Sequence, residues 1–169
     1  MSILIGKLAS LTLVPIVGAG VAYTTMSTKL GGGEKQIELR SMEDFQKHCW
    51  VSIQGDAKDE SGFNQKLLAC DLSKNSLKIK FFFHDEQEMK DALPKEVTNV
   101  LYKSGQDFSL TFGNKEIKEI KAVNVFVWKN VFQEGIKVGC QIKHVNPTFK
   151  QLRCGSTREQ TLEQFVFKK

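Results

Sequence analysis

Four cysteines, Cys49, Cys70, Cys140 and Cys154, are the residues of this chain with the clearest chemistry. An even number of cysteines in an exported chain favours disulfides, and four cysteines allow three pairings. Their spacing does not choose among the three. The alternative is that all four stay reduced and pack as small core hydrophobes, which the apolar neighbours of Cys70 and Cys140 also allow.

His144 suggests two other kinds of site. Cys140, His144 and Cys154 are zinc-ligating residue types, but the chain has no paired C-x2-4-C knuckle. A thiol hydrolase could use Cys49 as nucleophile, His144 as base and Asn146 as orienting residue, provided that all three lie within hydrogen-bonding reach. Neither set has a local signature, so we expect no catalytic residue, no metal site and no cofactor.

Two further groups of residues have simpler explanations than a ligand site. The acidic cluster Asp85, Glu86, Glu88 and Asp91 could hold a divalent cation, but acids are also favoured in the first turn of a helix. The run of glycines at 31–33 has no following Lys-Ser/Thr, which a phosphate-binding loop requires. We interpret these groups as a helix start and a flexible linker.

The charge balance does not favour a nucleic-acid partner. Lys and Arg total 24 against 19 Asp and Glu, which gives a net charge of +5. Arginine is the planar reader of phosphates and bases, yet the chain has only three scattered arginines, Arg40, Arg153 and Arg158. Most lysines lie near acids or alternate with apolar residues, so we interpret them as solvated surface.

The first 28 residues predict export. The stretch from Leu8 to Thr28 has no formal charge and follows a short start that contains Lys7. It could be a signal peptide cleaved after Ala22, or an uncleaved anchor that contacts the membrane through residues 3–28. A buried core helix is the alternative. We expect residues 1–28 to be a signal peptide or transmembrane anchor, 29–36 a Gly-rich linker and 37–169 one globular domain.

The N-terminal run Gly18-Ala19-Gly20-Val21-Ala22-Tyr23, after a short Lys-bearing start, resembles the uncharacterised paralogous proteins of haemotropic mycoplasmas. The resemblance covers about the first 23 residues. It implies an exported or anchored product at the cell surface with a binding or antigenic role, and it transfers no functional residue.

The remaining pattern predicts an α+β fold, with one antiparallel sheet of about four or five strands and helices on one face, preceded by the apolar segment. Residues 77–83 alternate as a strand with Leu77, Ile79, Phe81 and Phe83 facing inward. The pattern of residues 63–72 does not distinguish a helix from a strand. Other strands are expected at 108–112, 117–128 and 136–145. Helices are expected after the N-caps Ser41 and Thr157, at 85–93 and at 95–102.

Together these features predict an exported or membrane-anchored surface domain, at the cell membrane or secreted. We expect a non-enzymatic binding or antigenic module that faces the host, with a host or envelope macromolecule as partner. Two alternatives stay open: a small extracytoplasmic hydrolase with a thiol or acid-pair centre, and a structural subunit of the envelope. A pocket that gathers a nucleophile with a histidine would favour the hydrolase, and an exposed apolar patch would favour the binding module.

Overall fold

The computed structural model describes residues 36–56, 64–73, 79–90, 92–123, 125–136, 139–146 and 149–167. All of them belong to the larger of two compact units, Gly33–Lys169. The predicted signal peptide or anchor (1–28) and the glycines at 31–33 lie outside the described residues, as do Leu77 and Asp91. In the part that is described, no helix is both long enough and apolar enough to cross a membrane.

The described chain is mostly β-structure, so the predicted α+β fold with four or five strands is wrong. Nine antiparallel strands form one sheet in the order β6-β5-β4-β3-β2-β1-β9-β8-β7. In the described part of the chain, two short helices, α1 (Met42–His48) and α2 (Val125–Phe132), accompany it. The strands are β1 (Cys49–Gln54), β2 (Gln65–Asp71), β3 (Ile79–Asp85), β4 (Lys95–Tyr102), β5 (Asp107–Phe112), β6 (Ile117–Lys121), β7 (Cys140–His144), β8 (Lys150–Cys154) and β9 (Gln160–Gln164).

A β-bulge explains why β4 was predicted as a helix. Val97 and Val100 are both buried, and a spacing of three residues is typical of one face of a helix. In a regular strand these two side chains would point to opposite sides. The register between β4 and β5 shifts between Val97 and Asn99, and the extra residue turns both valines into the same core.

Two other predicted helices are also wrong. The segment after Thr157 is the strand β9, which lies between β1 and β8. Thr157 caps a tight turn instead, since its hydroxyl donates to the carbonyl of Cys154 at 2.7 Å. The segment after Asp85 is a series of turns, in which the Asp85 carboxylate accepts from the N–H groups of Gln87 and Glu88 at 3.0 and 3.2 Å. Short polar side chains satisfy turn backbone as readily as a helix start.

The predicted start of the first helix is confirmed. Ser41 is the N-cap of α1, and its hydroxyl accepts from the N–H of Asp44 at 3.2 Å. The Asp44 carboxylate in turn accepts from the N–H of Ser41 at 2.9 Å. This reciprocal capping box satisfies backbone donors that the helix itself leaves open.

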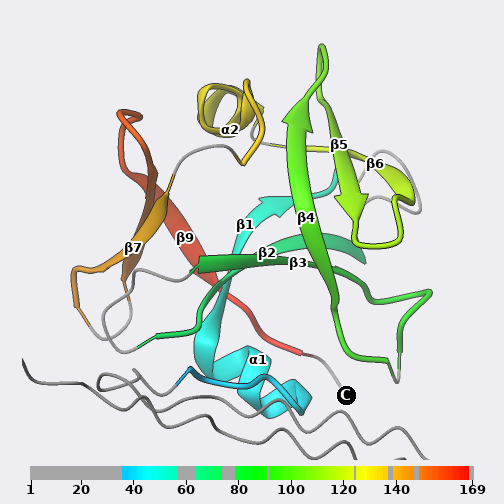
Figure 1. Cartoon of the computed structure of the whole chain (residues 1–169), viewed down its shortest axis with the longest axis vertical. Helices are drawn as coiled ribbons and strands as arrows, with labels where there is room; N and C mark the ends of the chain where they lie inside the picture. The colour runs from blue at the N-terminus through cyan, green and yellow to red at the C-terminus, as the bar shows by residue number, and fades with distance from the viewer. Residues whose placement is uncertain are drawn as a thin grey trace, which may run out of the picture. The chain divides into compact units, whose positions relative to one another are not determined.

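The sheet curves because β1 changes its neighbour part-way along. Its first half pairs with β9 through Trp50 and Val51. The register against β2 then shifts between Val51 and Ile53, and the hydroxyl of the intervening Ser52 donates to the carbonyl of Leu67 at 2.9 Å. Beyond this bulge, Gly55 forms a bridge with Ala122 after β6. Strands β1–β6 therefore curl round until the two ends of the run meet (Figure 1).

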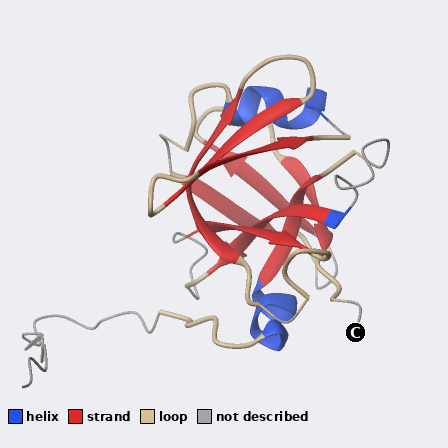
Figure 2. Ribbon diagram, turned by 90° about the vertical axis from the view of Figure 1, so that its right-hand side faces the viewer, coloured by secondary structure: helices blue, strands red, loops and turns tan. Residues whose placement is uncertain are grey.

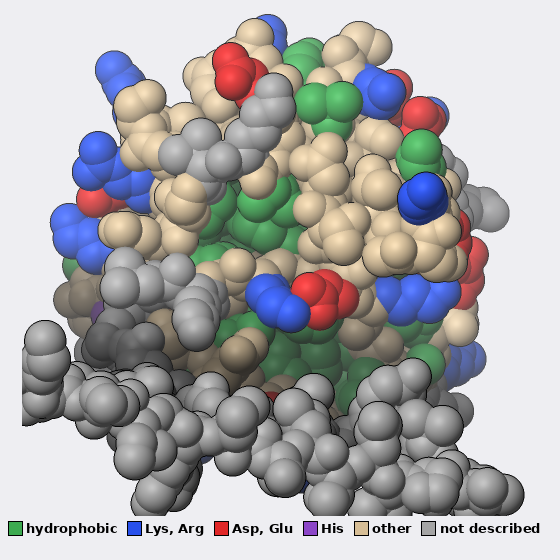
Figure 3. Space-filling view, in the orientation of Figure 1, with side chains coloured by type: hydrophobic (Ala, Val, Ile, Leu, Met, Phe, Trp, Pro, Cys, Tyr) green, Lys and Arg blue, Asp and Glu red, His purple; other side chains and the backbone are tan. Residues whose placement is uncertain are grey.

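Two apolar clusters lie on opposite sides of the sheet. The larger is enclosed by the curved sheet and covered by α2, and residues from all nine strands contribute to it. Figure 3 shows hydrophobic side chains in the hollow of this face, between β7 and β4. The smaller cluster lies on the outer side of β1–β3 under α1 and contains Phe45, Leu68, Phe82 and Phe165. In Figure 2 the two helices lie at opposite ends of the sheet.

The alternation predicted for β3 is confirmed over its described part. Phe81 and Phe83 are buried in the larger cluster, and Ile79 packs against it. Phe82 points to the other side and is also buried, packed edge to face on Phe45 at a centroid distance of 5.1 Å. β3 is therefore covered on both faces at its centre.

We expect Phe81→Ala to lower the free energy of unfolding by about 3–5 kcal/mol, because it removes a buried ring that packs edge to face on Phe132. The neighbouring Lys80→Ala should cost less than about 1 kcal/mol, since its ion pair with Glu96 is exposed on both sides. Urea denaturation of the two variants measures the difference. Equal losses would show that the register of β3 is wrong.

Candidate functional site

The four cysteines form two disulfides, Cys49–Cys70 and Cys140–Cys154. In both pairs the two residues are direct partners in an antiparallel ladder, β1 with β2 and β7 with β8. Opposite residues in such a ladder have their Cβ atoms close together. The pairing that spacing alone left open is therefore set by the strand register.

The zinc and thiol hypotheses both need a sulfur that the structure places in a disulfide. Cys140 and Cys154 are bonded to each other, so neither offers the thiolate that binds zinc. Cys49 is bonded to Cys70 and is not a free nucleophile. Among the described residues, no group of three or more His, Cys, Asp and Glu is placed to hold a metal ion.

His144, the base of the thiol hypothesis, pairs with Asp71 instead. Its Nε2 lies 3.1 Å from the Asp71 carboxylate, whose other oxygen accepts from the N–H of Ser73 at 3.1 Å. The imidazole packs edge to face on Trp50 at a centroid distance of 6.0 Å. The two partners are 73 residues apart in the sequence, so no local pattern could have revealed the pair. A buried carboxylate that orients an imidazole is one part of a hydrolytic centre. The other part is a nucleophilic side chain that is hydrogen-bonded to the imidazole.

The acidic cluster is neutralised by lysines in its described part. Lys118 lies 3.5 Å from Asp85 and 2.6 Å from Glu88, and Lys66 pairs with Glu86. Three carboxylates that already have ammonium partners form an ion-pair network. The cluster therefore ties the turn after β3 to β2 and β6.

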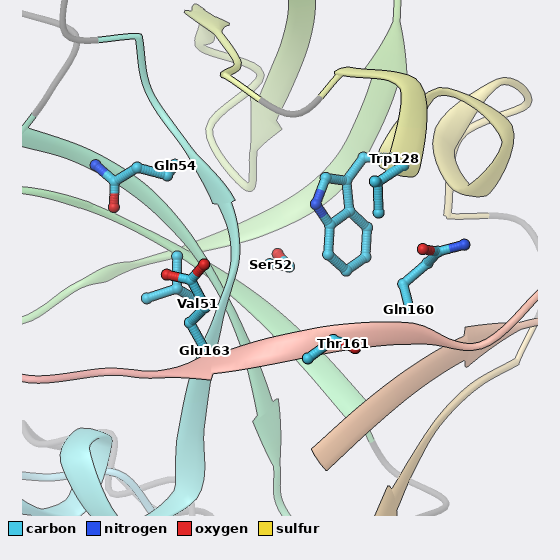
Figure 4. A pocket seen from close by; sticks show the side chains of 8 residues that line it. Val51, Ser52, Gln54, Trp128, Gln160, Thr161 and Glu163 are labelled. Carbon is cyan, nitrogen blue, oxygen red and sulfur yellow. The ribbon is translucent and has the colours of Figure 1, made fainter. Parts of the chain in front are cut away.

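A pocket of about 230 Å³ lies where β1 and β9 separate. Val127 and Trp128 of α2 form its apolar side. In Figure 4 the Trp128 indole lies between Ser52 and Gln160. Its lining is otherwise mostly polar, with Ser52 and Gln54 from β1 and Gln160, Thr161 and Glu163 from β9. The pocket is a direct product of the bulge, because β1 leaves β9 at that point to meet the end of β6.

Next to this pocket lies an exposed apolar surface that we call the α2 ledge: Phe126 and Val127 of the helix, and Val123, which precedes it. These side chains are 88%, 38% and 48% exposed, respectively. The other side of the helix is buried in the larger cluster through Val125, Trp128, Val131 and Phe132. Val127 belongs to both the ledge and the pocket. An apolar ledge beside a polar recess is suited to binding a partner that offers both kinds of group.

The α2 ledge was not expected from the sequence, because residues 117–128 were predicted to be a strand. β6 ends at Lys121, and the helix begins at Val125. The spacing of Val125, Trp128 and Phe132 is the i, i+3, i+7 pattern of a helix face and could have indicated it. The β-branched and aromatic composition favoured a strand instead.

Comparisons of this chain with protein-family models, with curated proteins and with solved structures find no match in any of the three.

We expect the double variant Cys140→Ser/Cys154→Ser to lose about 3 kcal/mol of unfolding free energy, because the bond closes a loop of 14 residues in sequence separation. Urea denaturation measures the loss. Mass spectrometry of the unreduced wild-type protein should identify the Cys140–Cys154 linkage, and reduction of the wild type is the matched control. If unreduced wild-type protein can be fully alkylated at four thiols, the assigned pairing is wrong.

Proposed function

We propose that this protein is an exported or membrane-anchored surface domain whose role is to bind a protein of the host or of the envelope, without catalysis. The observation that carries the proposal is Phe126, which is 88% exposed on a helix whose other side is buried. Such a side chain is an anchor for a partner rather than part of the core.

Two observations support a location outside the cytoplasm. Disulfides persist in oxidising compartments, and all four cysteines of the chain are in disulfides. The uncharged stretch from Leu8 to Thr28 has the composition of a signal peptide or an anchor. The resemblance of about the first 23 residues to the uncharacterised paralogous proteins of haemotropic mycoplasmas also implies a surface location.

The energetics of the ledge favour a binding role. Burying a phenylalanine side chain against a partner contributes about 1.5–3 kcal/mol through apolar area alone. The neighbouring Val123 and Val127 extend the apolar area, and the pocket beside them offers amide, hydroxyl and carboxylate groups for hydrogen bonds. An apolar centre with a polar border is the usual composition of a protein interface.

The hydrolase alternative receives less support. Its thiol version needs Cys49 as a thiolate, and Cys49 is held in the disulfide with Cys70. A structural role in the envelope differs from the binding role in one respect. A structural subunit would be bound to another envelope component at a fixed stoichiometry.

Export is tested by fractionation of cells that make the tagged full chain, followed by protease treatment of the intact cells. We expect the protein in the membrane or the medium, and the membrane-bound fraction should be digested without lysis. A cytoplasmic protein of the same cells is the control for lysis. Recovery of the full chain, Met1 included, from the soluble cytoplasm would contradict the proposal.

The ledge is tested by replacing Phe126 with the photo-crosslinker p-benzoylphenylalanine in the full chain. Leu93, a 41% exposed side chain in the β3–β4 connection, is the matched control position. We expect position 126 to give a discrete protein adduct in cells, and position 93 not to give it. Phe126→Ser should leave the unfolding free energy within about 0.5 kcal/mol of wild type, since the ring is exposed. Identical adducts at both positions would refute a specific role for the ledge.

A further inference from the structure

His84 is a fully buried imidazole without a hydrogen-bond partner. It lies on β3, its side chain is 0% exposed, and neither Nδ1 nor Nε2 is bonded to another residue. Burying an unpaired polar group is unfavourable, and an uncharged imidazole is less unfavourable there than an imidazolium. The position therefore favours the neutral form of His84.

The C-terminal segment 165–167 covers this imidazole. Phe165 and Phe167 pack on the ring at centroid distances of 5.8 and 5.9 Å. Phe165 is itself buried in the smaller cluster. Gln46 of α1 donates to the carbonyl of Phe167 at 3.4 Å, so helix and segment close over the outer side of β3 together.

The charged groups around His84 come from two elements. Lys66 on β2 lies over the Phe165 ring at 5.9 Å and pairs with Glu86, while Asp85 and Glu86 follow His84 in the chain. The positive charge of Lys66 disfavours protonation of His84, whereas the carboxylates of Asp85 and Glu86 favour it. α1, which packs on the same side, ends in His48.

Burial is the largest of these effects and lowers the pKa of His84 below its ordinary value of 6.5. A lowered histidine pKa means that the open or unfolded form takes up the proton first. The stability of the closed form is therefore complete above about pH 6.5 and falls as the pH drops below it. The stability of the closed form stops falling once the pH is below the lowered pKa, because both forms are then protonated.

We propose that His84 makes the docking of the C-terminal segment acid-sensitive, so that protonation of the imidazole releases Phe165 and Phe167 from the sheet. Release would uncover the smaller apolar cluster around Phe45 and Phe82 while the larger cluster stays packed. The inference does not depend on the proposed binding role of the α2 ledge, which lies on the other helix.

The test places 4-fluorophenylalanine at position 167 of the full chain and follows its ¹⁹F resonance between pH 7.5 and 5.0. We expect the ratio of released to docked signal to rise below pH 6.5, by at most about tenfold per pH unit, because one proton is taken up. In His84→Phe, which keeps an aromatic ring for Phe165 and Phe167, the ratio should not depend on pH. In His48→Gln, the control for the half-buried histidine at the end of α1, the rise should persist.

The emission of Trp50 and Trp128 distinguishes release from unfolding, because both side chains belong to or pack against the larger cluster. It is measured in His144→Gln, since the imidazole of His144 packs on Trp50 and its protonation would change the emission of that indole. If their emission changes in step with the fluorine signal, the transition is global and the proposal is wrong. The proposal also fails if the wild-type ratio is independent of pH.

A second measurement decides the question if His84→Phe does not fold. The chain has three histidines, so His48→Gln/His144→Gln leaves His84 as the only imidazole. An NMR titration of its ring resonances should give a pKa below 6.5 in the folded protein. A value at or above 6.5 would overturn the proposal.

Discussion

The change of neighbour along β1 is the constraint on which the rest of the structure depends. An antiparallel meander of six strands can stay open, or it can curl until its ends meet. The bulge at Ser52 permits the second outcome, because it turns the end of β1 away from β9 and towards Ala122. The curl encloses the larger cluster, and the gap that it leaves beside β9 becomes the pocket beneath Trp128.

The segment between the two edge strands completes this arrangement. β6 and β7 are the edges of the sheet, yet they are consecutive in the chain, so α2 crosses from one edge to the other. Its buried side fills the space that the curved sheet leaves open, which forces the remaining side chains outwards. Phe126 is exposed for that geometric reason. The candidate binding surface is thus a consequence of how the sheet is closed.

The outer side of the sheet is organised differently. α1 and the residues after β9 cover only β1–β3, and this smaller cluster holds one buried imidazole among phenylalanine rings. Hydrophobic packing would be served by another phenylalanine at that place, whereas His84 adds a group whose charge depends on pH.

The sequence by itself determined those features that depend on neighbours in the chain. The capping box at Ser41 and the alternation of Phe81 and Phe83 are of this kind, because backbone geometry alone relates such residues. Tertiary structure decided the rest. The bulge in β4 makes a strand resemble a helix, the ladder register selects the cysteine pairing, and His144 meets Asp71 across 73 residues. A helix with strand-like composition forms at α2 because burial of Trp128 and Phe132 under the curved sheet outweighs local propensity.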